Sequence, residues 1–357
     1  MESIVKRVLS PAKRRSRPVD EGALGFGDIF SEHMFRLDYH DGAWRGPRIE
    51  PFGPLSLSPA AMCLHYAQEI FEGLKCYRQS SGALALFRPR DNFARLNRSA
   101  RRICIPPLDE ELCLAALKEL ILVDQQWVPR AREASLYIRP FIIASEPHLG
   151  VRPAEDYIFL IITGPVGAYY AAGFAPIKIY VEPHYSRAAQ GGLGEIKTGG
   201  NYAASILAAE EARRRGFSQI LWLDPNEHKY IEEVGSMNMF FVIDDEVITP
   251  PLSGTILAGI TRDSVLTLAR DWGLSAVERP LSIEELLKAS SSGRLKEAFG
   301  TGTACVISPV GQFSYQGRDV PVGDGGIGPL TRRLYDELLG IQYGDRPDPY
   351  SWVTLIQ

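Results

Sequence analysis

The pattern of hydrophobic and polar positions divides the first half of the chain into short apolar runs and amphipathic stretches. The apolar runs predict strands at residues 83–87, 135–143 and 157–162. Apolar positions spaced three or four residues apart predict helices at residues 91–102 and 110–126. Strands that alternate with helices in this way indicate a domain of mixed α and β structure.

The second half of the chain shows the same mixture, with clearer helix ends. A helix predicted at residues 201–215 ends in three arginines and Gly216, the cationic last turn and glycine stop of a helix C-terminus. Thr261 is placed to cap a second helix at residues 262–272. The predicted strands of this half are residues 177–181, 219–223, 237–243, 247–249 and 304–309.

An uncharged stretch at residues 157–177 separates the two halves. Glycines and prolines interrupt it, whereas a membrane-spanning helix needs about 20 mostly apolar residues in one helical pattern. We therefore expect a buried strand followed by a linker at residues 165–176, whose aromatic Tyr169 suggests that the linker lines a site. The expected fold class is α+β, with a smaller N-terminal α/β domain at residues 1–164 and a larger C-terminal domain at residues 177–357.

Composition restricts the class of protein. Of the 357 residues, 45% are hydrophobic and 23% are charged, and the formal net charge of −4 gives no general attraction to nucleic acid. The five cysteines form no CxxC pair and the six histidines do not cluster, so we expect reduced thiols in the cytoplasm and no bound metal. A basic run from Lys6 to Arg17 is interpreted as a solvated, frayed tail.

A glycine-rich segment around Lys197 is the first candidate for chemistry. Gly194 and Gly199 flank the lysine and leave room for a flat ring beside its amine. A desolvated lysine is suited to Schiff-base formation. Taken alone, such a segment more often means a mobile loop with an exposed lysine.

Two further segments offer groups of complementary charge. Glu233 enters an apolar strand, where a carboxylate needs a partner such as a protonated ring nitrogen, although a surface glutamate fits the same pattern. Gly259 leads into a helix whose first amides could hold an anion, and residues 300–304 form another donor-rich turn. An ordinary capped helix and a hairpin turn explain these two features as well. Together, a lysine, a carboxylate and an anion site are what pyridoxal 5'-phosphate requires.

Longer motifs give these segments a common setting, because the sequence resembles the class IV (fold type IV) aminotransferases over nearly its whole length. The signature of that class is matched by Glu233-x-Gly-x-x-Asn238-Met-Phe240, Val247-x-Thr249 and Leu257-x-Gly259-Ile260-x-Arg262. The branched-chain amino-acid subfamily is indicated by Leu64-His-Tyr66-Ala-Gln-Glu-Ile-Phe71-Glu-Gly73-Leu-Lys75 and Ser135-Leu-Tyr137-Ile-Arg139-Pro140.

The resemblance implies a homo-oligomer with pyridoxal phosphate at the domain interface of each chain and Lys197 as catalytic residue. It implies transfer of the amino group of L-leucine, L-isoleucine or L-valine to 2-oxoglutarate, within amino-acid biosynthesis. The implied cofactor contacts are Arg95, Lys197, Tyr202, Glu233, Ser236, Gly259, Ile260, Thr261 and Thr303. The implied substrate contacts are Phe71, Tyr137, Arg139, Tyr169, Thr303 and Ala304, with Tyr66, Leu149 and Val151 reaching in from the partner subunit.

One departure from the family and two alternatives remain. Mammalian members carry a CxxC pair where this chain has Cys305-Val-Ile-Ser308, so we expect no disulfide switch and interpret Cys305 as a small buried hydrophobe. A D-amino-acid aminotransferase or an aminodeoxychorismate lyase of the same fold is the alternative, which aromatic residues 71, 137 and 169 disfavour. A non-catalytic binding module would have lost Lys197.

Overall fold

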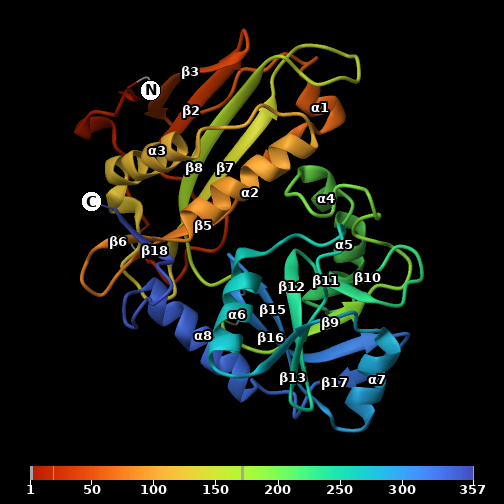
Figure 1. The fold of residues 1–357 in the computed structure, drawn as a ribbon. Helices are drawn as coiled ribbons and strands as arrows, with labels where there is room; N and C mark the ends of the chain where they lie inside the picture. The colour runs from red at the N-terminus through yellow and green to blue at the C-terminus, as the bar shows by residue number, and fades with distance from the viewer. Residues whose placement is uncertain (1–2, 19, 170–172, 357) are drawn as a thin grey trace. The chain divides into compact units, whose positions relative to one another are not determined.

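The computed structural model describes residues 3–18, 20–169 and 173–356. The chain forms two units, each built around its own sheet (Figure 1). Unit 1 comprises Met1–Ala171, Ile196–Gly199 and Gly340–Gln357, and unit 2 comprises Ala172–Glu195 and Gly200–Leu339. The C-terminal residues therefore belong with the N-terminal part of the chain, although the sequence led us to expect them in the C-terminal domain. No helix in the described ranges is long and apolar enough to cross a membrane.

Unit 1 contains a nine-stranded sheet in the order β1–β3–β2–β8–β7–β5–β6–β18, with β4 paired to β7. The first and last strands of the chain are thus the two edges of one sheet. The strands are β1 (Val5–Lys6), β2 (His33–His40), β3 (Ala43–Pro51), β4 (Glu69–Phe71), β5 (Leu74–Arg78), β6 (Leu84–Phe87), β7 (Ser135–Ala144), β8 (Tyr157–Val166) and β18 (Val353–Ile356).

The core of unit 1 lies between this sheet and helices α2 (Pro89–Arg102) and α3 (Glu110–Val123) (Figure 1). Strand β7 shows that the two faces of the sheet differ in burial. From Leu136 onward its even-numbered residues are buried, while its odd-numbered residues are only half-buried. Successive side chains of a strand point to opposite faces, so Tyr137 and Arg139 share the face that looks away from this core. The short helix of this unit is α1 (Met62–Tyr66).

Unit 2 contains a second nine-stranded sheet, in which β11–β10–β9–β16–β15–β12 forms a closed circuit because β11 also pairs with β12. Its strands are β9 (Ile177–Val181), β10 (Gln219–Leu223), β11 (Ile231–Val234), β12 (Met237–Ile243), β13 (Glu246–Thr249), β14 (Ser275–Glu278), β15 (Leu295–Gly302), β16 (Val306–Tyr315) and β17 (Arg318–Pro321). Its helices are α4 (Gly199–Ala203), α5 (Ile206–Arg214), α6 (Ile260–Asp271), α7 (Ile283–Ser291) and α8 (Pro329–Gln342), of which α4 and α8 cross a unit boundary.

Three local predictions are wrong. The helix expected at residues 201–215 is two helices, α4 and α5, and between them the Ser205 hydroxyl donates to the carbonyl of Tyr202 at 2.7 Å. Helix α6 begins at Ile260 with Gly259 as its N-cap, so Thr261 lies inside the first turn and does not cap it. The linker expected from residue 165 begins later because β8 continues to Val166; residues 170–172 of that linker lie outside the described residues.

The basic N-terminal segment is not the free tail that the sequence suggested. Strand β1 pairs with β3, and the backbone N–H of Leu9 donates to His33 Nε2 at 2.9 Å. The Arg15 guanidinium donates to the carbonyl of Ser31 at 2.7 Å, and that of Arg17 donates to the carbonyl of Gln126 at 2.6 Å. The arginines therefore serve as hydrogen-bond donors that hold the segment on unit 1.

Candidate active site

Lys197 is fixed through its backbone on unit 1. Its carbonyl accepts a hydrogen bond from the N–H of Phe71 at 3.0 Å, and its own N–H donates to the Ser99 hydroxyl at 3.2 Å. The Nζ atom lies 4.8 Å from the centroid of the Phe71 ring, within the range of a cation–π contact. A half-buried amine on an anchored backbone can react while its position is kept.

The loop after Lys197 is packed tightly against β4. The Thr198 hydroxyl donates to the carbonyl of Glu69 at 2.7 Å, and an added Cβ at Gly199 would lie 1.9 Å from Glu69 Oε1. A larger residue at position 199 would displace the Glu69 carboxylate from its place beside the backbone N–H of this residue. Burial raises the pKa of the Glu69 carboxyl, although a backbone hydrogen bond from Gly199 opposes the shift. The sequence did not single out Glu69.

Four of the expected substrate contacts lie together in an aromatic cluster of unit 1. The Arg139 guanidinium lies over the rings of Phe71, at 4.6 Å, and Tyr137, at 5.4 Å, and it donates to the Tyr137 hydroxyl at 3.1 Å. Phe26 makes edge contacts with Tyr137 and Tyr169 at centroid distances of 5.0 and 5.3 Å. Phe71, Tyr137, Arg139 and Tyr169 are thus brought together as expected, and Phe26 is a member that the sequence analysis missed.

Arg95, the expected phosphate ligand, forms a buried ion pair in unit 1. Its Nε and Nη2 atoms contact the two carboxylate oxygens of Glu72 at 2.7 and 2.9 Å. Both side chains are almost fully buried. A bidentate pair fixes the plane of the guanidinium, so Glu72, which the sequence analysis overlooked, orients Arg95.

In unit 2, Glu233 is a buried carboxylate with several donors. Oε1 accepts from Asn238 Nδ2 and from the backbone N–H of Leu257, both at 3.0 Å, and Oε2 pairs with Arg187 Nε at 2.6 Å. Hydrogen bonds and an opposite charge favour the ionised form of a carboxyl. Glu233 is buried within β11, so it is not the surface glutamate that the sequence also allowed.

Arg187 connects this carboxylate to two loops of the same unit. Its Nη1 atom donates to the carbonyls of Gly194, at 3.1 Å, and Thr255, at 2.6 Å. The first of these loops precedes Lys197 in sequence, and the second precedes helix α6. The sequence gave no signal for Arg187, because its contacts with Gly194, Thr255 and Glu233 form only when the chain folds.

The start of α6 is the position at which the sequence led us to expect an anion site. Its N-cap is Gly259, which makes no side-chain cap. An added Cβ there would lie 1.9 Å from Asn238 Oδ1, so the packing of the loop requires glycine. Ile260 and Thr261 occupy the first turn, where backbone amides and the helix dipole favour a negative charge.

The remaining predicted residues lie on helix α4 and in two turns of unit 2, and the pairing of β12 with β15 brings those two turns close together. Tyr202 lies half-buried on α4, Thr303 and Ala304 lie half-buried in the turn between β15 and β16, and Ser236 is exposed between β11 and β12. Cys305 is half-buried and not buried as expected; its sulfur lies 3.1 Å from that of Met237.

The residues expected to reach a partner subunit are exposed and apolar. Leu149 is 66% exposed and Val151 is 86% exposed, in the loop after β7, and Tyr66 at the end of α1 is 37% exposed. The bridge between Ala61 and Pro147 holds this loop and α1 side by side.

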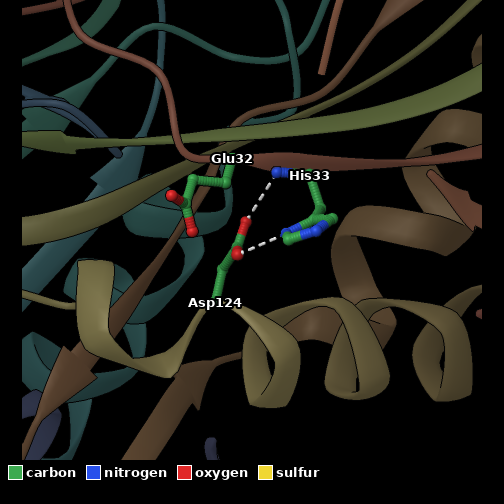
Figure 2. Close-up of side chains that lie close together, drawn as sticks. All are labelled: Glu32, His33 and Asp124. Carbon is green, nitrogen blue, oxygen red and sulfur yellow. Dashed lines mark hydrogen bonds and ion pairs between the residues drawn. The ribbon is translucent and has the colours of Figure 1, made fainter. Parts of the chain in front are cut away.

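Glu32, His33 and Asp124 are the one group in the described ranges with the spacing of a metal site, but hydrogen bonds occupy their ligand atoms. Figure 2 shows the backbone N–H and the ring of His33 both facing Asp124, at 2.9 and 2.7 Å. His33 Nε2 accepts from the N–H of Leu9, and Glu32 accepts from Arg15. The cluster therefore joins segments of unit 1.

Comparison with known proteins gives three consistent matches. Residues 69–313 match the family described as Amino-transferase class IV. Branched-chain-amino-acid transaminase 1 of Bacillus subtilis (strain 168) is 51% identical over 337 residues, which cover 94% of this chain and 95% of that protein. The branched-chain-amino-acid aminotransferase of Mycolicibacterium smegmatis is 46% identical over 360 residues, 99% of this chain and 98% of that protein.

Solved structures agree with the sequence relatives. The branched-chain amino acid aminotransferase of Escherichia coli superposes with a TM-score of 0.75 at 29% identity, covering 90% of this chain and 99% of that chain. The branched-chain amino acid aminotransferase from T.th., solved with pyridoxamine 5'-phosphate, has a TM-score of 0.75 at 28% identity, covering 90% of this chain and 98% of that chain.

Proposed function

Because this chain belongs to the class IV aminotransferases, a family shown by its match over residues 69–313, we propose that it is a branched-chain-amino-acid transaminase. It transfers the amino group of L-leucine, L-isoleucine or L-valine to 2-oxoglutarate, and it uses pyridoxal 5'-phosphate. The observation that carries the proposal is Lys197, whose backbone is fixed on Phe71 and Ser99 while its amine stays half-buried.

The residues present fit this cofactor. Lys197 offers a primary amine, and Gly199 keeps side-chain atoms away from its approach. The start of α6 at Gly259, which has no side-chain cap, suits a phosphate, and the Glu233 carboxyl, which accepts hydrogen bonds and pairs with Arg187, suits a protonated ring nitrogen. When bound, the cofactor supplies an electron-accepting ring that stabilises negative charge at the substrate α-carbon.

The chain supplies proton transfer and selectivity. Lys197 moves a proton between the substrate α-carbon and the C4′ atom of the cofactor, as a general base and acid. Phe71, Tyr137 and Tyr169 form apolar walls that select branched side chains, at roughly 1–3 kcal/mol for each methylene-sized difference. In this proposal Arg139, whose guanidinium lies over the rings of Phe71 and Tyr137, pairs with the second carboxylate of 2-oxoglutarate.

The remaining assignments are part of the same proposal. Arg95, Ile260, Thr261 and Thr303 contact the phosphate, and Tyr202 contacts the phenolic oxygen of the ring. Tyr66, Leu149 and Val151 complete the substrate site of a second copy in a homo-oligomer, which their exposure supports. Cys63, Cys76, Cys104 and Cys113 are free thiols, which fits a cytoplasmic setting.

Replacing Lys197 tests the function. We expect Lys197→Ala to lose the visible absorbance of the bound cofactor and L-leucine:2-oxoglutarate transamination, because the covalent anchor and the base are one side chain. Lys178→Ala, at an exposed position of β9, is the matched control and should keep both. Coupled assays with L-leucine and D-alanine separate the subfamilies. Turnover of D-alanine without L-leucine would contradict the substrate assignment, and a colourless wild type after cofactor addition would contradict the function.

A further inference from the structure

A pocket in unit 2 is lined by Glu232, the residue that precedes Glu233 in the sequence. Its volume is about 200 Å³. Pockets for drug-sized ligands are usually about 300–1,000 Å³, so this pocket has room for a ligand of only a few heavy atoms. Glu232, which precedes Glu233 in β11, is one of its lining residues and is only 5% exposed.

Only one of the two carboxyl oxygens of Glu232 has a hydrogen-bond partner among the described residues. Its Oε1 atom accepts a hydrogen bond from the Thr255 hydroxyl, which is itself within 3.0 Å of Ser253 Oγ. Its Oε2 atom is shielded from solvent and has no hydrogen-bond partner among the described residues. A buried carboxyl oxygen without a donor is costly, and a ligand that brings a donor into this pocket would remove the cost.

The charge of the lining favours a cation. Its ionisable side chains include two acids, Asp224 and Glu232, and no lysine or arginine. Asp224 is already occupied, since four backbone N–H groups between Asn226 and Tyr230 donate to its carboxylate and lower its pKa despite partial burial. Glu232 is therefore the acceptor left for a ligand.

A metal ion does not suit this lining. Calcium requires six to eight oxygen ligands and magnesium near-octahedral geometry, whereas a single free carboxyl oxygen is offered here. The apolar part of the lining is formed by Pro225, Pro250, Pro251, Pro280, Ile231 and Ile256, and the prolines among them have no N–H donor. Gln190, Asn226, Tyr230 and Ser253 add uncharged polar groups to the lining.

We propose that this pocket is a second ligand site, which binds a small primary ammonium with a short alkyl body. The ammonium donates to Glu232, and the alkyl group packs against the prolines. A free amino acid fits poorly, because the lining has no cation for its carboxylate. The site touches the candidate active site through Thr255, whose hydroxyl bonds Glu232 and whose carbonyl accepts from Arg187, the partner of Glu233.

Isobutylammonium is the probe, titrated by calorimetry into the holoenzyme after borohydride has reduced the cofactor onto Lys197. The reduced linkage cannot exchange with the amine, so covalent reaction at the active site is removed from the signal. We expect one saturable site, which Glu232→Gln weakens roughly tenfold or more because it loses a charged acceptor. Glu227→Gln, an exposed residue of the adjoining loop, is the control and should bind as the wild type does.

Two further arms need no variant. Isobutanol, which has the same alkyl body without charge, should bind at least roughly tenfold more weakly. Burial raises the pKa of Glu232 to about 7, so ammonium binding should tighten between pH 5 and pH 8. The proposal is overturned if the folded wild type shows no saturable site, if Glu232→Gln binds equally well, or if isobutanol binds as tightly. None of these outcomes bears on the transaminase activity, which is assayed on unreduced enzyme.

Discussion

At the scale of single residues, a buried ion pair in each unit orients a group to which the proposal gives a role. Arg95 is held by Glu72 in unit 1, and Glu233 is held by Arg187 in unit 2. A buried pair adds little net stability, but removal of one partner leaves an uncompensated charge. The pairs therefore act by fixing orientation, and they make each partner sensitive to substitution.

Replacing Glu72 tests this dependence in unit 1. Glu72→Ala removes the carboxylate that neutralises the buried Arg95 guanidinium, and we expect the free energy of unfolding to fall by about 3–5 kcal/mol. Chemical denaturation of the apoprotein measures the change. Glu111→Ala, which breaks an exposed pair with Arg90, is the control and should have almost no effect. A loss in the control as large as that in Glu72→Ala would show that burial is not the cause.

The ionisation of Glu232 makes stability depend on pH. Burial raises its pKa from 4.5 to about 7, so between these values the folded chain holds a proton that the unfolded chain has lost. The free energy of unfolding contributed by this group therefore falls as the pH rises through that window. Glu232→Gln cannot ionise, and we expect its stability relative to wild type to rise between pH 5 and pH 8, by on the order of 3 kcal/mol at most. Denaturation at both pH values checks this, and an unchanged difference would contradict it.

The candidate site was predictable from sequence only where chemistry coincides with a local motif. Lys197 is marked by its glycines, and Glu233 by an acid within an apolar strand. Arg187 and Glu72 gave no such signal, because their roles arise from contacts between segments far apart in sequence. Arg187 reaches Thr255, which lies 68 positions away, and this contact exists only after folding.

At the scale of elements, the His33–Asp124 pair joins the N-terminal segment to unit 1. Asp124 follows α3 and faces His33, which begins β2 (Figure 2). Leu9, whose backbone N–H donates to the His33 ring, lies in the N-terminal segment. Because Leu9 donates to Nε2, the His33 proton lies on Nδ1 and points at Asp124. The Asp124 carboxylate thus orients the His33 ring, and that ring binds the N-terminal segment at Leu9.

Asp124→Ala should release that stretch. The substitution leaves the backbone N–H and the ring N–H of His33 buried without an acceptor, at about 1–3 kcal/mol for each group. We expect faster hydrogen exchange at residues 5–17 and earlier tryptic cleavage at its arginines. Asp41→Ala removes an exposed acid beside His40 and is the matched control. Exchange at residues 5–17 that stays as slow as in the wild type would refute the joining role.

The predicted strand bounds were right where the apolar pattern is regular. Strands β10 and β12 are apolar runs that end where polarity returns. Strand β9 has the predicted bounds because its buried apolar residues alternate with exposed Lys178 and half-buried Tyr180. The helix at 201–215 failed because Ser205 bonds a backbone carbonyl, a competing interaction that propensity does not register. The prediction of a free N-terminal tail was wrong because basic residues usually indicate a solvent-exposed segment. Here the guanidinium groups of Arg15 and Arg17 donate hydrogen bonds to backbone carbonyls of unit 1.

At the scale of the whole molecule, the chain returns to its starting unit. Strand β18 pairs with β6, so Val353 lies opposite Phe87. No pattern within either strand encodes this pairing, and the sequence therefore left residues 340–357 with the second half. The α+β class was accessible because it depends on the mixture of elements, whereas their assignment to units depends on long-range pairing.

Exposed apolar side chains on unit 1 are costly for a protein that works alone. Leu64, Leu149 and Val151 are 60%, 66% and 86% exposed, and they lie on α1 and the loop bridged to it. Exposed apolar side chains on neighbouring segments favour an interaction site. Since the proposal brings Leu149 and Val151 into the substrate site of a second copy, assembly and activity should be lost together.

The double variant Leu149→Glu/Val151→Glu tests that link. Charge repulsion and desolvation at the patch should convert the wild-type oligomer to a monomer at micromolar concentration, as measured by sedimentation velocity. Transamination of L-leucine should fall with it, while cofactor absorbance at Lys197 persists. Leu252→Glu, at an apolar residue of unit 2 that is 47% exposed, controls for added surface charge. A wild-type monomer with full activity would refute the shared site, and so would a double variant that still assembles and turns over L-leucine normally. A monomer that keeps full activity would separate assembly from catalysis and restrict the substrate site to residues of one chain.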